Sequence, residues 1–269
     1  MEPLVSIVIP CYNYGRFLAE AIDSALAQTH RAREVLVVDD GSDDDTPEVA
    51  ARFGERVRYV RRDNGGLSAA RNTGAAHARG SWIVFLDADD RLEPTYVEET
   101  LRVATSDPAV SFVYTQLRLF GRVEGVTSHP DFDPRLLVRG NYINASALLK
   151  TEDVRALKFD TEFRGGWEDW DFFLGLVGMG RRGRLLDKPL LCYRKHPSHG
   201  SMIDALDAAG AASLRRAALR RLYFKHRRLF SPWERARHFA KDLVLRIPGA
   251  MRWRARRRGS ARRRGSADS

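Results

Sequence analysis

The sequence of 269 residues is poor in features that mark several large protein classes. Its two cysteines, Cys11 and Cys192, exclude a disulfide framework and a cysteine-rich metal site and favour a reducing compartment. No apolar run reaches the roughly 18 residues of a membrane-spanning helix; the longest, 172–180, is interrupted by glycines. The N-terminus lacks the basic and apolar regions of a secretory signal. We therefore expect a cytoplasmic location.

Acidic residues are scarce in the C-terminal part of the chain, whereas they outnumber the basic residues in the rest. Residues 1–213 hold 26 Lys and Arg against 32 Asp and Glu, a net charge of −6. Residues 214–269 hold 19 against 3, a net charge of +16, so the total of +10 comes from the C-terminal part. We expect an acidic domain over 1–213, an amphipathic helical extension over 214–250 and a basic disordered tail over 251–269.

The first 115 residues alternate short β-branched runs with helical patterns. This alternation predicts an α/β fold with a mostly parallel sheet flanked by helices. Residues 120–165 are less regular, with 141–150 as a candidate strand, and 185–193 reads as a last strand. The predicted strands of the first part are 5–9, 34–39, 57–60, 82–86 and 110–114, and the predicted helices are 16–28, 46–53, 67–79 and one that Pro94 begins.

Polar and glycine-containing clusters follow four of these strands. Ligands bind beyond the carboxyl ends of the strands in such sheets, so the clusters are expected to meet at one edge. Each cluster alone is also explained by ordinary turn formation. The clusters lie at 10–13, 39–40, 64–66 and 87–89.

Two of the clusters suggest a site for a metal and a phosphate. Asp87 and Asp89 flank one alanine after a buried strand, and carboxylates at this spacing can bind a hard divalent cation. Asp90 adds charge, and either it or Asp87 can instead hold a ribose hydroxyl. The segment 64–68 begins a helix, whose N-terminal N–H groups favour a diphosphate. Arg71, one turn further, can reach a phosphate or a base.

Together these motifs resemble those of the family 2 glycosyltransferases of GT-A fold. The resemblance covers about residues 4–200 in the order and spacing of that family. It implies that a nucleoside-diphosphate sugar is the substrate. The motifs are 5–13 (VSIVIPCYN), 37–42 (VVDDGS), 64–72 (NGGLSAARN) and 85–90 (FLDADD).

The resemblance assigns a role to each matching position. Tyr12 would lie against a uracil ring above Pro10, and Asp40, rather than Asp39, would accept from the N3–H of the base. Thymine offers the same N3–H, so a UDP-sugar is favoured over a GDP-sugar without excluding dTDP. The expected nucleotide-binding residues are Pro10, Tyr12, Asp40, Asn64, Gly66, Arg71 and Asp87, and the expected metal ligands are Asp89, Asp87 and His196.

The segment 165–171 (GGWEDWD) resembles the family's Glu-Asp motif, whose Asp is the catalytic base of inverting members. Asp169 shares a helix stripe with apolar residues, which raises a carboxyl pKa and suits a base near neutral pH. Glu168 lies about 100° around the helix and suits an acceptor hydroxyl or a supporting hydrogen bond. Trp167 and Trp170 are expected as an acceptor platform. Alternatively, Glu168 and Asp169 only stabilise the start of a helix, and the two tryptophans are core residues.

The segment 193–199 follows the last predicted strand and resembles a Tyr-Arg-x-His stretch of the family. His196 matches the histidine near the metal or diphosphate, and His199 is a second candidate. Imidazole is a suitable metal ligand, and Arg194 or Lys195 can neutralise a departing nucleotide.

The C-terminal part predicts two amphipathic helices and an arginine-rich tail. Residues 218–230 place an apolar stripe opposite arginines, and Ser231 with Glu234 forms a capping box that starts a second helix. The first helix is expected to pack on the catalytic domain. The second helix and the tail suit an anionic membrane surface, which favours a peripheral location on the inner face of the cell membrane. Nucleic acid is the least favoured partner of this basic part, because no recognition motif accompanies the arginines.

The sequence therefore favours a metal-dependent inverting glycosyltransferase that uses Mg²⁺ or Mn²⁺. Its acceptor would be a saccharide or a lipid-linked hydroxyl, as in cell-surface polysaccharide or glycolipid assembly. A nucleotide-sugar-binding protein without transfer activity is the alternative from another class. A nucleotidyltransferase is disfavoured because the first strand is not followed by a glycine-rich loop.

Overall fold

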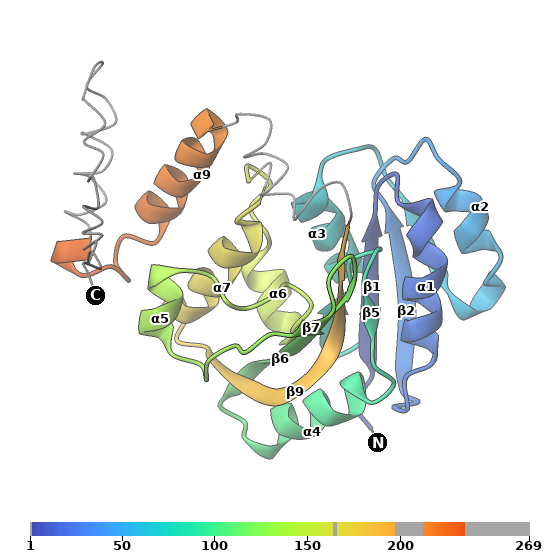
Figure 1. Cartoon of the computed structure of the whole chain (residues 1–269), viewed down its shortest axis with the longest axis horizontal. Coiled ribbons are helices and arrows are strands. Elements are labelled where there is room, and N and C mark those ends of the chain that lie inside the picture. Colours follow the sequence, from blue (N-terminus) through green and yellow to red (C-terminus); the bar gives the residue numbers. More distant parts are fainter. Residues whose placement is uncertain (1, 164–165, 197–211, 235–269) are drawn as a thin grey trace, which may run out of the picture. The chain divides into compact units, whose positions relative to one another are not determined.

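The computed structural model describes residues 2–163, 166–196 and 212–234. The chain divides into two compact units, Met1–Leu229 and Phe230–Ser269. The first unit holds all strands and helices that have bounds in the described residues (Figure 1). None of the described helices is long and apolar enough to cross a membrane.

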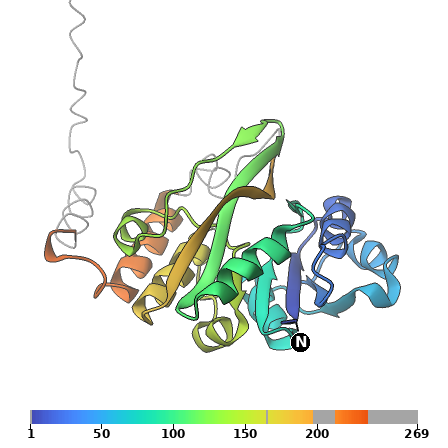
Figure 2. The same cartoon turned by 90° about the horizontal axis from the view of Figure 1, so that it is seen from below.

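A nine-stranded sheet forms the centre of the first unit, in the order β3-β2-β1-β4-β8-β6-β9-β5 with β7 paired to β6. Its first four strands are parallel, and β8 runs antiparallel between β4 and β6. Figure 2 shows the long parallel pair β6 and β9 side by side. The strands are β1 (Val5–Cys11), β2 (Arg33–Asp39), β3 (Arg58–Arg61), β4 (Trp82–Phe85), β5 (Arg91–Leu92), β6 (Val110–Gly121), β7 (Gly125–Val126), β8 (Leu148–Lys150) and β9 (Arg182–Lys195).

Helices cover both faces of this sheet. Every residue of β1 is buried, as expected for a central strand. Its odd-numbered residues join a core with α1 and α4, while α3 lies against the opposite face (Figure 1). The helices are α1 (Gly15–Leu26), α2 (Thr46–Ala51), α3 (Leu67–His77), α4 (Tyr96–Ser106), α5 (Pro134–Arg139), α6 (Thr151–Leu157), α7 (Glu168–Gly178) and α9 (Ala212–Lys225), with a 3₁₀ turn, η1, at Gly54–Arg56.

The predicted α/β fold with a mostly parallel, helix-flanked sheet is confirmed, with differences in the second half. The candidate strand 141–150 is too long, because only its last three residues, β8, pair with neighbours. Strands β5 and β7 and helices α5 and α6 have no counterpart among the predicted elements. Each is short, so its hydrophobic period is weak in the sequence.

The C-terminal helix α9 belongs to the first unit, and its Leu222 and His226 side chains are buried. In the second unit, the N–H of Ser231 donates to Oε2 of Glu234 over 2.9 Å, and the N–H of Glu234 donates back to Oγ of Ser231. The predicted capping box is therefore present. The rest of the predicted second helix and the tail lie outside the described residues.

Candidate active site

One cavity of about 640 Å³ lies at the carboxyl ends of the first four parallel strands. It gathers side chains from β1, β2, α3, β4, α7 and β9. The predicted site residues in its wall are Pro10, Tyr12, Asp40, Asn64, Gly66, Arg71, Asp87, Asp89, Trp167, Glu168, Asp169 and His196. The clusters that follow the strands therefore meet at a single concave site, as expected from their places in the sequence.

The two carboxylates after β2 face different surroundings. Asp40 lines the cavity, whereas Asp39 is buried and accepts hydrogen bonds from Tyr59 and Arg61. Oδ2 of Asp40 accepts from the N–H of Gly66 over 2.7 Å, and its Oδ1 accepts from the Arg62 guanidinium. Asp40 thereby orders the loop that begins α3. A nucleobase N–H would share or replace one of these bonds.

An aromatic ring and a turn complete this end of the cavity. Tyr12 is 47% exposed, so its ring presents an open face beside Asp40. Gly66 has φ 87° immediately before α3, a left-handed conformation that glycine adopts without strain. The first N–H groups of α3 consequently open toward the cavity, which favours an anion there.

Arg71 connects the two acidic motifs. Its side chain is 2% exposed, and its two terminal nitrogens donate to Oδ1 of Asp87 over 3.0 Å and to Oε1 of Glu168 over 2.9 Å. Its Nε has no hydrogen-bond partner among the described residues. One buried cation therefore joins the end of β4 to the start of α7.

Asp89 pairs with the predicted histidine. Oδ2 of Asp89 lies 2.7 Å from Nε2 of His196, which extends β9, and both line the cavity. Burial and the charge of Asp87 raise the pKa of Asp89, and His196 opposes this rise. Arg194 holds the same strand end, because its Nε donates to the carbonyl of Asp89 over 2.7 Å. The second candidate, His199, lies outside the described residues.

This donor set fits a hard divalent cation. Two carboxylates and an imidazole line one wall, and Mg²⁺ commonly binds one or two carboxylates together with substrate phosphates. Within the described parts of the chain, no three His, Cys, Asp or Glu side chains form a complete metal site by themselves. A cation here would therefore depend on oxygens of the substrate. Asp90 does not contribute, because it is buried and accepts from the N–H of Arg194 outside the cavity wall.

Asp169 is the carboxylate best suited to accept a proton. Burial raises its pKa to about 7; the charge of Glu168 adds to this rise and that of Arg71 opposes it. Its Oδ2 accepts from Nδ2 of Asn141 over 2.9 Å. Trp167, just before α7, has φ 68°, an unusual conformation for a large aromatic residue. Strain of this kind gathers at functional sites.

Trp170 is the predicted site residue that the structure does not bring to the cavity. Its ring is buried, and its indole N–H donates to the carbonyl of Leu137 in α5 over 2.6 Å. A ring engaged in this way offers no open face to a sugar. Trp167 alone of the two tryptophans lines the cavity.

Several wall residues were not predicted from the sequence. Asn141 reaches the site from a loop before β8, and Tyr14, Asn144, Phe163 and Tyr193 also line or adjoin it. Tyr193 could have been predicted from the sequence, because it begins the segment that contains His196. The others come from irregular segments with no periodic pattern, so only the folded chain reveals them.

Comparison with known proteins identifies the family of the chain. Residues 6–157 match the family model described as glycosyl transferase family 2. An uncharacterised glycosyltransferase of Bacillus subtilis, EpsJ, is 30% identical over 230 residues, which cover 74% of this chain and 63% of EpsJ. The chain spans 14–32% of the length of the first five curated relatives that it matches.

Solved structures share the fold. The mannosyltransferase PcManGT of Pyrobaculum calidifontis, in complex with GDP-Man and Mn²⁺, superposes with a TM-score of 0.62 at 22% identity and covers 91% of this chain and 70% of its own. A fragment of S. aureus TarS in complex with UDP-GlcNAc has a TM-score of 0.61 at 20% identity and covers 73% and 60%. The matching family model spans more than half of the sequence, and we conclude that the chain belongs to glycosyl transferase family 2 and has the GT-A fold.

Proposed function

We propose that the protein transfers a sugar from a nucleoside-diphosphate donor to an acceptor hydroxyl with inversion at the anomeric carbon. The observation that carries this proposal is the position of Asp169: a half-buried carboxylate with a pKa of about 7 shares one cavity with the nucleotide-side residues. A base of this pKa accepts a proton effectively near neutral pH.

The nucleotide side of the cavity suits a uracil base. Tyr12 would stack on the ring above Pro10, and Asp40 would accept from the base N3–H in place of Arg62. Asn64 and Gly66 line this end of the cavity, where the N–H groups of Leu67 and Ser68 in the first turn of α3 would favour the diphosphate. A UDP-sugar is the favoured donor. TarS in complex with UDP-GlcNAc supports this choice, whereas PcManGT in complex with GDP-Man makes guanine donors a necessary comparison.

The acidic side of the cavity would carry out the transfer. Asp169 removes the proton of the acceptor hydroxyl as the oxygen attacks the anomeric carbon from the side opposite the leaving nucleotide. A single displacement of this kind inverts the centre and needs no covalent enzyme intermediate. Glu168 and Asp87 remain hydrogen-bonded to Arg71.

Asp89 and His196, with Asp87, would hold Mg²⁺ or Mn²⁺. When bound, such an ion supplies Lewis-acid neutralisation of the departing nucleoside diphosphate. PcManGT in complex with Mn²⁺ supports this assignment by similarity of fold. We expect EDTA to abolish transfer and added Mn²⁺ or Mg²⁺ to restore it.

The acceptor would be a saccharide or a lipid-linked hydroxyl, as in the assembly of a cell-surface polysaccharide or glycolipid. Trp167 would contact it, because it lines the cavity beside Asp169. The basic C-terminal part would bring the enzyme to an anionic membrane surface on the cytoplasmic side, where lipid-linked acceptors reside. Nucleic acid is not an expected partner.

The test is nucleotide release and sugar transfer by the purified full-length protein with UDP-, dTDP- and GDP-sugars. Asp169→Asn should lower the transfer rate by about 10²- to 10⁴-fold, the usual contribution of a general base. The affinity for UDP, measured by calorimetry, should stay unchanged. Retained turnover in this variant would refute the assignment, and a product that keeps the anomeric configuration of the donor would refute inversion.

A further inference from the structure

The first turn of α7 is held by three other helices. Glu168 accepts a hydrogen bond from Arg71 of α3, and Trp170 donates one to the carbonyl of Leu137 in α5. Asp171 accepts from Lys225, the last residue of α9, and from His226, the residue that follows it. Between them, Asp169 faces the cavity. The orientation of the proposed base is thus set by the contacts of its immediate neighbours, and α9 supplies one of them.

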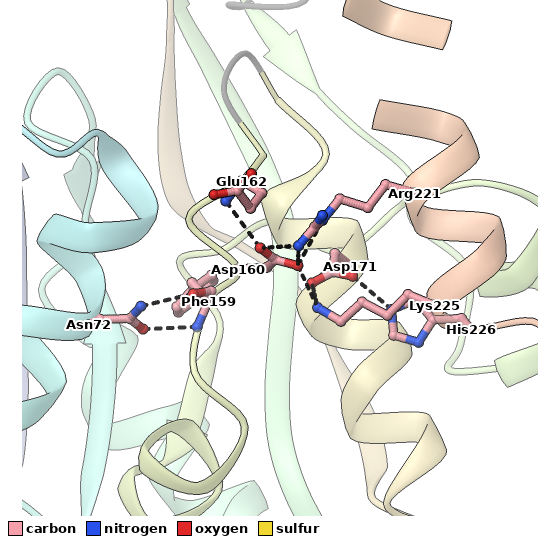
Figure 3. A network of polar contacts seen from close by, with 8 residues as sticks. All are labelled: Asn72, Phe159, Asp160, Glu162, Asp171, Arg221, Lys225 and His226. Atoms are coloured by element: carbon pink, nitrogen blue, oxygen red, sulfur yellow. Dashed lines mark hydrogen bonds and ion pairs between the residues drawn. The ribbon is translucent and has the colours of Figure 1, made fainter. Parts of the chain in front are cut away.

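Asp171 is buried and has its hydrogen-bond partners at the C-terminal end of α9. Its side chain is 1% exposed; Nε2 of His226 donates to its Oδ1 over 2.8 Å, and Nζ of Lys225 donates to its Oδ2 over 2.7 Å (Figure 3). A carboxylate that is buried without partners is strongly disfavoured. The burial of Asp171, a residue of α7, is therefore favourable only while α9 is docked.

Lys225 also reaches a second acidic residue on the loop before α7. Its Nζ lies 3.0 Å from Oδ2 of Asp160, and Arg221 donates to both oxygens of the same carboxylate (Figure 3). One ammonium group thereby joins the loop to the helix that carries Asp169. Removing it would break this link, although Asp160 keeps Arg221 and Asp171 keeps His226.

The loop held by Lys225 continues into the support of Arg71. The backbone of Phe159, next to Asp160, exchanges two hydrogen bonds of 2.8 Å with the side chain of Asn72 in α3 (Figure 3). The Phe159 ring lies 5.3 Å from the Arg71 guanidinium and stacks on Phe172 at 4.2 Å. A continuous set of contacts thus runs from α9 to both acidic motifs of the cavity.

From this set of contacts we propose that α9 is a positioning element of the active site and that Lys225 is its central positioning residue. By bridging Asp160 and Asp171, Lys225 sets the orientation of the first turn of α7 and hence the direction in which Asp169 meets the acceptor hydroxyl. The inference rests on the proposed function, because it takes Asp169 to be the base.

The experiment compares Lys225→Met with Arg228→Gln in the full-length protein. Arg228 is exposed in the turn that follows α9 and forms no ion pair with the described residues, so it controls for the loss of one positive charge. Lys225→Met should lower kcat by roughly 10- to 100-fold, the effect of a small misplacement of a reacting group. The KM for the donor and the Kd for UDP should not change, because the nucleotide side is built on the sheet. Lys225→Arg should recover much of kcat, and Arg228→Gln should behave as the wild type.

Two results would overturn the inference. One is a wild-type kcat in folded Lys225→Met; the other is an equal loss of UDP affinity and kcat, which indicates general damage. Should Lys225→Met fail to fold, Asp160→Asn decides, because it weakens the bridge from Lys225 to the loop while Asp171 keeps both of its partners. Its kcat should fall with UDP affinity retained, and an unchanged kcat would count against the inference. An active Asp169→Asn would instead refute the proposed function. An inactive Asp169→Asn beside a wild-type Lys225→Met would refute this inference alone.

Discussion

At the scale of single residues, Arg71 is the point on which both acidic motifs depend. A guanidinium that is 2% exposed between Asp87 and Glu168 neutralises two carboxylates that would otherwise repel each other in a partly dry site. Buried ion pairs add little net stability when complete, but the loss of one partner is costly, because the other charge stays buried. Arg71 thus keeps the end of β4 and the start of α7 at a defined separation.

We expect Arg71→Met to lower the free energy of unfolding by about 3 kcal/mol, since it leaves Glu168 and Asp87 without their cation. Arg102→Met is the matched control: Arg102 is exposed and 3.9 Å from Glu99, and such pairs contribute about 0–1 kcal/mol. Urea unfolding followed by circular dichroism measures both. Equal stability of the two variants would mean that Arg71 is not the buried link described here.

The pKa of Asp169 predicts the pH profile of the enzyme. Because the base acts in its ionised form and its pKa lies at about 7, kcat/KM should fall below pH 7 and level off above it. Glu168→Gln removes a like charge that raises this pKa, so the ionised form is favoured and the acidic limb should move to lower pH. Measurement of kcat/KM against pH for both proteins tests the sign. A limb that stays in place or moves upward would contradict it.

At the scale of elements, the approach of α3 to β1 places Arg71 and the phosphate-facing turn. A Cβ built on Gly74 would lie 2.3 Å from Cγ1 of Val8, so α3 packs on the strand with no room for a side chain. The close contact explains why this helix is rich in small residues. It also means that a change in packing far from the cavity moves residues within it.

Gly74→Ala should therefore destabilise the fold by about 1–3 kcal/mol, the usual range for overpacking, and should lower transfer activity as α3 shifts. Gly178→Ala is the control, because a Cβ at this exposed position near the end of α7 meets nothing within 4 Å. Alanine there should stabilise the helix by about 0.5–1 kcal/mol. Denaturant unfolding of both variants is the measurement. A Gly74→Ala variant as stable as Gly178→Ala would contradict the packing argument.

At the scale of the whole molecule, the acidic and basic parts of the chain have separate tasks in our proposal. We propose that residues 1–213 bind and transfer the sugar, that 214–250 form a helical extension and that 251–269 form a basic tail. The residues of α9 that face Asp160 and Asp171 belong structurally to the catalytic unit. Attraction to an anionic surface is therefore expected to come mainly from the residues that follow α9.

The full chain should pellet with vesicles that contain anionic phospholipid, and a chain that ends at Phe230 should stay in the supernatant. Each basic residue near such a surface contributes about 1 kcal/mol, and high salt should weaken the binding. Co-sedimentation with anionic and with neutral vesicles measures this. Equal pelleting of the two chains would remove the membrane proposal.

The sequence by itself determined the family, the mostly parallel sheet of its first half and most of the cavity wall. This was possible because β-branched runs, strand-end acidic pairs and the glycines before α3 are local signals, and parallel strands bring their carboxyl ends together. Only the tertiary structure decided that Trp170 is a core residue, that Asn141 meets Asp169, and that Lys225 of α9 joins Asp160 to Asp171. Contacts between segments distant along the chain depend on how helices pack on the sheet, which no local pattern encodes.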